Sequence, residues 1–373
     1  MNSYFKIIVL FVFLLACKND DDNGMDMPDN LDSDTTMVVI DSTDTIVDTT
    51  DMPVDSSIVS GEKINGFSFV SPKNSFPENW LEPMVTKGKG NWMAISPFAG
   101  ASISEPEVHF DISSQWWGER PEGVKTLVDY ANNYGMKVMI KPQVWMWDGW
   151  VGGFDLETEE EWLKWETDYE EYIMTFANIA ADKNVELFCI GTEYKIAAVK
   201  REAFFRALIK KVRNVYSGKL VYAANWDNYQ NIRFWDELDY IGIDSYFNLV
   251  EQKTPNIEDM KVAWVDWVNQ IKVVQMEYNK QILFTEYGYM SSDYTAWKNW
   301  ENEGNLANLD LNMQGQVNAF EAFFQTFWTK DWVAGGFIWK WFHDYENRGG
   351  TNHKEYSPQR KPAETKIAEW YSK

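Results

Sequence analysis

Short apolar segments alternate with amphipathic segments along most of the chain. Eight of the apolar segments have the length and composition of strands that are buried on both faces, as in a parallel sheet. We expect these strands at residues 66–70, 92–98, 137–143, 185–193, 220–225, 240–246, 282–287 and 336–341. This order of segments is typical of a chain that alternates strands and helices.

The segments between the expected strands carry apolar residues at helical spacing. Thr158 and Glu161 form a capping-box pattern at the start of one such segment, and apolar positions follow from Trp162 to Ala180. Eight strands alternating with helices predict an α/β fold of the (β/α)8, or TIM barrel, type. A doubly wound open sheet is the alternative. It is less favoured because no glycine-rich phosphate-binding turn follows an early strand.

Two of the expected strands end in the same way, with a glutamate inside a Thr-Glu-Tyr sequence. Glu193 follows the apolar run 185–191, and Glu286 follows the run 282–284. A carboxylate at the carboxyl end of a barrel strand occupies the usual position of a catalytic group. A pair of carboxyl groups is what glycoside hydrolysis requires, so these residues are the catalytic candidates. The alternative is two unrelated acids at strand ends.

Several motifs around these glutamates resemble glycoside hydrolase family 113. They are Gly191-Thr192-Glu193, Asn225-Trp226, the run 239–246, Thr285-Glu286-Tyr287-Gly288, Trp339 and the tail 357–363. The resemblance covers about residues 62 to 370. It implies a member of a clan of retaining barrel glycosidases, in a family known for β-1,4-mannanases. It also implies that Glu193 is the acid/base and Glu286 the nucleophile.

The sequence departs from the clan pattern immediately before the acid/base. Many clan members carry an Asn there, which hydrogen-bonds the sugar 2-hydroxyl, whereas this chain has Thr192. That contact must therefore be made differently in this protein.

Sugar binding requires aromatic platforms and a few polar groups, and strand ends and loops offer both. Trp339 is the best candidate for the platform beside the scissile bond. Tyr246 is expected either to hydrogen-bond the nucleophile or to be an ordinary aromatic of the barrel rim. Lys141, Gln143 and Asn225 either contact sugar hydroxyls or complete the rim. Further platforms are expected among loop tryptophans, namely Trp145 and its counterparts Trp116, Trp117, Trp147 and Trp150.

The charge and the motif content exclude other classes of function. The net charge of −23 argues against nucleic acid as a partner. Twelve Asp and one Lys lie between Lys18 and Asp55, so about half of that charge is local and does not imply a charged substrate. The three His are scattered, and no Cys or His cluster has metal-ligand spacing. We therefore expect neither a metal nor a cofactor.

The first residues have the features of a targeting segment. Lys6 precedes the apolar run 7–15, and the sequence 14–17 resembles the lipobox of bacterial lipoproteins. We predict a signal peptide over residues 1–17 with a lipidated Cys17; an ordinary secretory signal with a chance Cys is the alternative. The other cysteine, Cys189, is expected to be a buried core thiol.

The segment 18–60 is low in aromatic residues and rich in Asp, Thr and Ser. It is predicted to be a disordered tether, because it cannot bury enough apolar surface to fold. Its early run of three Asp resembles the acidic signal of surface-exported lipoproteins in Gram-negative glycan degraders; a solvated spacer is the alternative. Residues 61–373 would form the catalytic domain. We therefore expect a monomeric protein of the cell envelope, anchored by lipid at the outer-membrane surface of a Gram-negative bacterium.

With the family resemblance, these features predict a retaining endo-β-1,4-mannanase that acts on mannan or manno-oligosaccharides. Another clan activity, either a β-glucanase or an exo-β-mannosidase, is the alternative among enzymes. A non-catalytic, glycan-binding surface lipoprotein is the alternative of a different class. The presence of both Glu193 and Glu286 argues against it, because a binding protein has no need of the pair.

Overall fold

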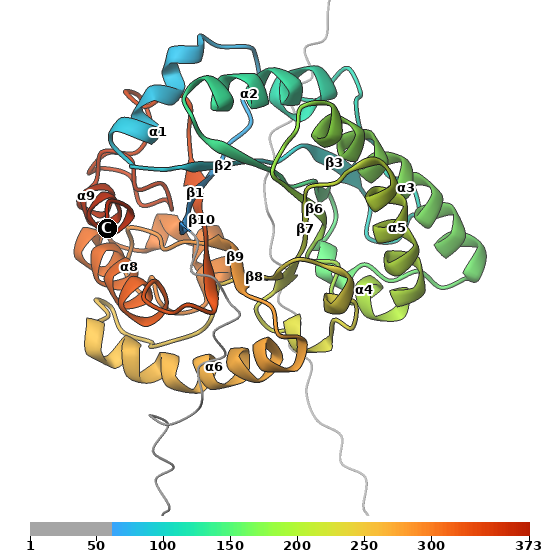
Figure 1. The fold of residues 1–373 in the computed structure, drawn as a ribbon. Helices are drawn as coiled ribbons and strands as arrows, with labels where there is room; N and C mark the ends of the chain where they lie inside the picture. Colours follow the sequence, from blue (N-terminus) through green and yellow to red (C-terminus); the bar gives the residue numbers. More distant parts are fainter. Residues whose placement is uncertain (1–61) are drawn as a thin grey trace, which may run out of the picture. The chain divides into compact units, whose positions relative to one another are not determined.

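The computed structural model describes residues 62–373. The predicted signal peptide, Cys17 and the tether lie outside the described residues. Within them, eight parallel strands close into a barrel (Figure 1), in the order β1-β10-β9-β8-β7-β6-β4-β2. The predicted TIM barrel is confirmed. The barrel strands are β1 (Ile64–Phe69), β2 (Trp92–Ile95), β4 (Lys137–Ile140), β6 (Leu187–Thr192), β7 (Lys219–Asn225), β8 (Ile241–Asp244), β9 (Ile282–Tyr287) and β10 (Val333–Trp341).

Two of the predicted strands are each divided in two by a proline. Pro97 and Pro142 have no backbone N–H to donate to the barrel ladder, so β2 and β4 end shortly before them. The chain then continues as β3 (Phe98–Ala101) and β5 (Gln143–Met146), which pair with each other in a separate two-stranded sheet. The predictions of single strands at 92–98 and 137–143 were therefore wrong in their extent. Gln143 begins β5 and does not end a barrel strand.

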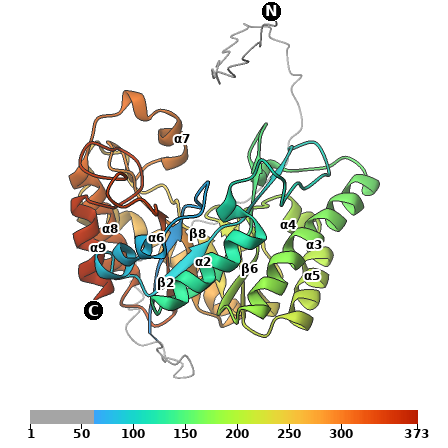
Figure 2. The same cartoon turned by 90° about the horizontal axis from the view of Figure 1, so that it is seen from above.

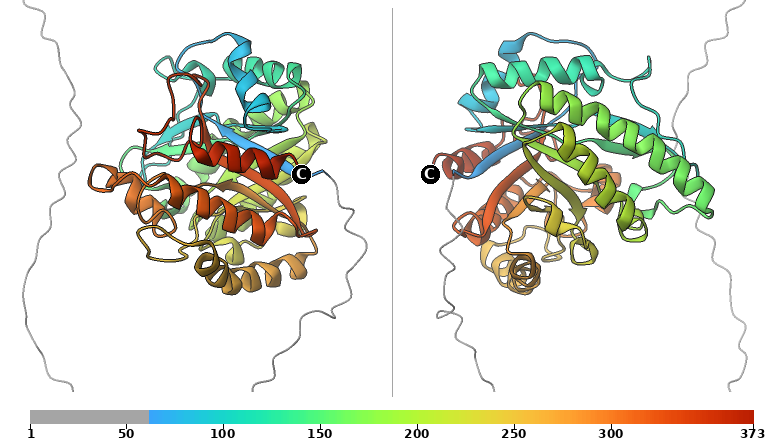
Figure 3. Two further views of the ribbon diagram at one scale, coloured as in Figure 1. Left: turned by 90° about the vertical axis from the view of Figure 1, so that its left-hand side faces the viewer. Right: turned by 45° about the vertical axis from the view of Figure 1, so that its right-hand side comes forward.

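The longer helices cover the outside of the barrel (Figures 1 and 3). Among them, α3 has the predicted capping box, since Thr158 accepts a hydrogen bond from the Glu161 N–H and the Glu161 carboxylate accepts one from the Thr158 N–H. The longer helices are α2 (Pro121–Asn133), α3 (Glu159–Asp182), α5 (Glu202–Val215), α6 (Ile257–Tyr278), α8 (Met313–Phe327) and α9 (Pro362–Tyr371). No helix within residues 62–373 combines the length and the apolar character needed to cross a membrane.

Shorter elements lie in the connections between the strands and the longer helices. They include the helices α1 (Glu82–Thr86), α4 (Ala197–Lys200) and α7 (Asn299–Gly304) and the 3-10 turn η4 (Val151–Gly153). Figure 2 shows α7 projecting from one end of the barrel. The connection that contains α7 follows β9 and therefore begins at the carboxyl end of that strand.

Side chains fill the interior of the barrel. Trp92, Met139, Leu187 and Phe337 belong to one buried cluster there, together with Cys189, which is the buried thiol that the sequence predicts. The packing is tight enough to require glycine at position 66, because a Cβ there would lie 2.3 Å from a ring carbon of Phe337. The carboxyl ends of the barrel strands are therefore supported by a close-packed barrel interior.

Candidate active site

The carboxyl ends of the barrel strands surround a cavity of about 590 Å³. Both predicted catalytic residues, Glu193 after β6 and Glu286 on β9, contribute to its wall. Five of the six predicted sugar-binding residues line the same cavity: Gln143, Trp145, Asn225, Tyr246 and Trp339. The fold thus brings together residues that are widely separated in the sequence.

Glu286 is held by three hydrogen-bond donors. Oε1 accepts from Lys141 Nζ at 2.5 Å and from Gln143 Nε2 at 2.7 Å, and Oε2 accepts from Tyr246 Oη at 2.8 Å. Of the two expectations for Tyr246, the structure shows the hydrogen bond to Glu286. Donors on both oxygens, one of them positively charged, stabilise the ionised carboxylate. The same contacts fix the direction in which the carboxylate points.

Lys141 lies beneath Glu286 and has no exposed surface. Its ammonium is also 3.2 Å from both carboxylate oxygens of Asp244, which accepts a further hydrogen bond from Thr285 at 2.7 Å. Burial opposes the charge, but Asp244 and Glu286 raise the pKa of Lys141 above its ordinary value, so the ammonium stays charged. Because it is enclosed by carboxylates, Lys141 cannot make the direct contact with sugar hydroxyls that its strand-end position suggests.

Asp244 is as deeply buried as Lys141 and shares its single positive charge with Glu286. Burial raises the pKa of Asp244 to about 7, and Glu286 adds to the rise although Lys141 opposes it. Sequence reasoning missed the role of this residue. Its position at the end of β8, within the motif Ile-Asp-Ser-Tyr, was the available signal.

Glu193 has a different environment from Glu286. Burial, with the nearby charges of Asp244 and Glu286, raises the pKa of Glu193 to about 8, while Lys141 and a hydrogen bond from Trp150 oppose the rise. The side chain therefore keeps its proton at neutral pH. One carboxyl group of the cavity is thus stabilised as an ion and the other as an acid, which is the division of roles that acid–base chemistry on two carboxyls needs.

The backbone at Glu193 is also unusual. Its φ of 55° is in the left-handed region, which costs a non-glycine residue roughly 1–2 kcal/mol. Two backbone hydrogen bonds hold this conformation, from the Glu193 N–H to the Ala223 carbonyl at 2.8 Å and from the Lys195 N–H to the Glu193 carbonyl at 2.7 Å. Such outliers persist where the surrounding structure over-determines them, commonly at functional sites.

A sequence model of Glycoside Hydrolase Family 113 matches residues 68–361. The chain belongs to glycoside hydrolase family 113. The matched region contains both glutamates and the surroundings of the cavity.

Solved structures of other glycosidases have a similar fold. A structure of a family 113 β-1,4-mannanase is 26% identical, with a TM-score of 0.72, over 84% of this chain and 99% of that one. A family 113 β-mannanase from Alicyclobacillus acidocaldarius, in complex with ManMIm, has the same fold at 23% identity, with a TM-score of 0.72 over 85% of this chain and 99% of that one. A family 5 mannosidase from Rhizomucor miehei shares the fold at 12% identity and a TM-score of 0.58, over 84% of this chain and 94% of that one. No curated protein sequence matches the chain.

The predicted loop tryptophans of this family 113 protein separate into two groups. Trp145 and Trp150 line the cavity, and Trp145, on β5, is 66% exposed. The other three lie outside the cavity wall. Trp147 stacks on His109 with ring centres 5.9 Å apart, and Trp117 packs edge-on against Phe76. Proximity in the sequence therefore did not decide which tryptophans face the cavity.

The cavity wall also contains aromatic residues that no strand-end pattern indicated. Trp300, on α7, stacks on Trp226 with ring centres 5.6 Å apart and an angle of 24° between the rings. Both line the cavity, as do Glu303 on α7 and Tyr356 in the connection after β10. Trp300, Glu303 and Tyr356 lie in long connections after the strands, where the sequence carries no periodic signal, so sequence reasoning missed them.

The polar groups of the wall are arranged by their neighbours. Asn225 donates its amide to Asp227 at 2.9 Å, and Asp227 pairs with Lys195 at 2.5 Å. The Thr192 hydroxyl donates to the Pro142 carbonyl at 3.1 Å. The residue in the place of the clan Asn is therefore engaged with the backbone, whereas Asn225 and Gln143 present amides in the cavity wall.

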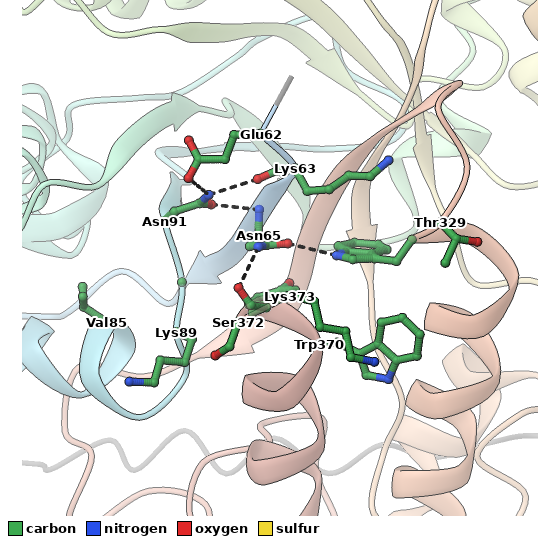
Figure 4. A pocket seen from close by; sticks show the side chains of 13 residues that line it. Glu62, Lys63, Asn65, Val85, Lys89, Asn91, Thr329, Trp370, Ser372 and Lys373 are labelled. Atoms are coloured by element: carbon green, nitrogen blue, oxygen red, sulfur yellow. Dashed lines mark hydrogen bonds between the residues drawn. The ribbon is translucent and has the colours of Figure 1, made fainter. Parts of the chain in front are cut away.

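A larger cavity of about 730 Å³ lies at the amino ends of β1 and β2 (Figure 4). Its polar groups are bonded to one another. The Asn91 amide donates to Glu62 and accepts from the Asn65 N–H, and the Asn65 side chain bonds the Tyr371 carbonyl and the Trp328 indole. These contacts tie α8 and α9 to β1. The cavity therefore has the character of the stabilising end of a barrel and not of a reactive site.

Proposed function

We propose that this family 113 glycoside hydrolase is a retaining endo-β-1,4-mannanase that cleaves mannan or manno-oligosaccharides by double displacement. Glu286 would act as the nucleophile and Glu193 as the acid/base. The observation that carries the proposal is the contrast between the two carboxyl groups of one cavity. Three donors stabilise ionised Glu286, whereas burial and neighbouring carboxylates raise the pKa of Glu193 to about 8.

In the first step Glu286 would attack the anomeric carbon while Glu193 gives its proton to the glycosidic oxygen. The bond between the anomeric carbon and that oxygen breaks, and the leaving sugar departs with the proton. In the second step a water molecule attacks the anomeric carbon, gives a proton to ionised Glu193, and the bond to Glu286 breaks. The net reaction consumes one water and returns both carboxyl groups to their starting states.

The electrostatics of the cavity suit this change of role. Ionised Glu286 is one of the charges that raise the pKa of Glu193. Ester formation removes that charge, so the pKa of Glu193 falls in the intermediate. Glu193 is then more readily ionised at the point where a base is needed.

The walls of the cavity suit a sugar substrate. Trp339, Trp145 and the stacked pair Trp226 and Trp300 supply aromatic surface, and Gln143 and Asn225 supply amides. Aromatic walls with a few polar groups are typical of sugar sites. Mannan is the proposed polymer because the family 113 relative of 26% identity is described as a β-1,4-mannanase.

The first test is the product profile of the enzyme on mannan, cellulose and xylan. Release of manno-oligosaccharides of several lengths from mannan supports the proposal. Release of mannose alone would indicate an exo-β-mannosidase, and hydrolysis of cellulose in place of mannan would indicate a β-glucanase. Binding without hydrolysis of any polymer would indicate a glycan-binding protein.

The second test assigns the two glutamates. Glu286→Ala should abolish turnover of all substrates, because the covalent step is lost. Glu193→Ala should retain turnover of aryl mannosides with good leaving groups, which need no proton, and added azide should increase it and give a β-mannosyl azide. Glu277→Ala, at an exposed position of α6, is the control. The opposite behaviour of the two variants would show that Glu193 is the nucleophile and Glu286 the acid/base.

A further inference from the structure

We infer that Trp150 is a positioning residue for Glu193, and that its indole N–H determines which oxygen of the acid carries the catalytic proton. The inference rests on the proposed function, because it takes Glu193 as the acid/base. It concerns a residue outside the barrel strands, on the connection between β5 and α3.

The geometry connects the two side chains directly. Trp150 Nε1 lies 3.2 Å from Glu193 Oε2, and within residues 62–373 it is the side chain that donates to this carboxyl group. Trp150 is 46% exposed and lines the cavity, so the hydrogen bond lies at the edge of the site. Glu193 Oε1 receives no donor from the described part of the chain.

The connection around Trp150 is built to hold the indole in place. A Cβ at Gly152 would lie 2.2 Å from a ring carbon of Trp150, so the ring rests directly on the backbone of η4. Just before it, Asp148 accepts hydrogen bonds from the Ser102 hydroxyl at 2.7 Å and from the Ile103 N–H at 2.8 Å. These contacts attach the connection to the segment that follows β3.

The hydrogen bond from Trp150 favours one of the two carboxyl oxygens of Glu193 as the carrier of the proton. A neutral carboxyl group has one carbonyl oxygen, which accepts hydrogen bonds well, and one hydroxyl oxygen, which donates its proton. An N–H that points at Oε2 therefore favours Oε2 as the carbonyl and leaves the proton on Oε1. When Glu193 is ionised, the same N–H stabilises the carboxylate.

Other charges also act on Glu193, so the contribution of Trp150 has to be separated from theirs. Asp244 on β8, Glu286 on β9 and Lys141 after β4 are the charges that act most on Glu193, and Glu193 in turn acts on Tyr222 on β7. Asp227, Glu303 and Tyr246 line the same cavity. None of them is altered by a change at Trp150. The hydrogen bond from Trp150 lowers the pKa of Glu193, in opposition to burial. Its loss should therefore move the titration of Glu193 to higher pH.

The experiment compares Trp150→Phe with Trp147→Phe. The change at Trp150 keeps an aromatic ring on Gly152 but removes the N–H, whereas Trp147 stacks on His109 outside the cavity wall and serves as the control. The titration of Glu193 is followed by NMR of ¹³C-labelled glutamate in the free protein, with the resonance assigned by its loss in Glu193→Gln. We expect the titration midpoint of Glu193 to rise by about one pH unit in Trp150→Phe. The free energy of a hydrogen bond to a charged group corresponds to a pKa shift of about that size. No change is expected in Trp147→Phe.

Kinetics provide the second measurement. In Trp150→Phe the basic limb of the plot of kcat/KM against pH should shift to higher pH, together with the NMR midpoint. The value of kcat should fall about tenfold, while KM changes less than about twofold. An unchanged midpoint would overturn the inference, and a raised KM with an unchanged pH profile would make Trp150 a sugar platform only. The NMR titration needs no substrate. Absence of mannan hydrolysis in the wild type would therefore refute the proposed function without affecting the measurement of the Trp150 contact.

Discussion

The ammonium of Lys141 lies 2.5 Å from Oε1 of Glu286, at a place where Lys141 has no exposed surface and Glu286 is 7% exposed. The same ammonium is bonded to the buried carboxylate of Asp244. One positive charge therefore serves two carboxylates from adjacent strands, β8 and β9. Both the stability of the barrel and the orientation of the proposed nucleophile depend on it.

Replacing the buried ammonium tests this dependence. Lys141→Met should lower the free energy of unfolding by roughly 3–5 kcal/mol at pH 7, because two buried carboxyl groups lose the ammonium that both of them contact. Lys141→Met combined with Asp244→Asn should recover part of that stability, since one of the two groups left without this partner is replaced. Turnover should remain low in both variants, because Glu286 has lost a donor.

Urea unfolding and kcat measure the two effects separately. Lys137→Met, at the exposed start of β4, the strand that Lys141 follows, is the matched control and should change both little. A loss below about 1 kcal/mol in Lys141→Met, within the range of exposed ion pairs, would contradict the interpretation of the buried bridge.

The raised pKa of Glu193 predicts a pH dependence of stability. The pKa is about 8 in the folded protein and 4.5 as the ordinary value, so the folded state binds this proton more tightly. The stabilisation is complete below pH 4.5 and is lost as the pH rises through about 8. Glu193→Gln cannot ionise. Its unfolding free energy relative to the wild type should therefore be higher at about pH 9 than at about pH 5, by roughly 1–3 kcal/mol in urea titrations at the two pH values. An equal difference at both values would contradict the raised pKa.

The hydrogen bond from Tyr246 to Glu286 predicts a loss of activity with little loss of stability. Tyr246→Phe removes one donor from a carboxylate that keeps two others. We expect kcat to fall about 10–100-fold, which corresponds to the usual free energy of a hydrogen bond to a charged group. The change in Tm should be small. Tyr240→Phe, just before β8, is the control. An unchanged kcat would mean that Tyr246 is an ordinary aromatic of the rim.

Sequence reasoning predicted the elements best where one strong local signal was present. The strand at 282–287 has the predicted bounds, and the capping box of α3 forms as expected. The strands near Pro97 and Pro142 were extended too far, because the apolar pattern continues across each proline while the hydrogen-bond ladder does not.

The sequence predicted which residues form the candidate site better than it predicted the contacts among them. The strand-end rule located Glu193, Glu286, Tyr246 and Trp339, since the carboxyl ends of barrel strands share one face. It could not distinguish Lys141, which is enclosed beneath Glu286, from Gln143, which faces the cavity. That difference depends on side-chain direction and packing from other strands. The contact between Trp150 and Glu193 similarly depends on the path of a long connection.

The amino-terminal predictions concern residues outside those that the structure describes. We propose that Cys17 carries lipid and that the acidic segment after it holds the barrel at the outer membrane surface. Cys17→Ser should release the protein from the membrane fraction, because a stable anchor requires more than one acyl chain and the variant would have none. Activity per molecule should be unchanged. Fractionation followed by immunoblotting measures the distribution, and retention of Cys17→Ser in the membrane fraction would contradict the lipoprotein interpretation.

The central claim is that Glu286 forms a covalent bond to the sugar during turnover. It is tested most directly with a manno-oligosaccharide that carries 2-fluoro and dinitrophenyl groups, because such a substrate forms the glycosyl-enzyme readily and releases it slowly. Peptide mass spectrometry after brief incubation locates the label. We predict one sugar on the peptide that contains Glu286, with no label in Glu286→Gln. A label on Glu193, or inverted anomeric configuration in the product of normal turnover, would contradict the account.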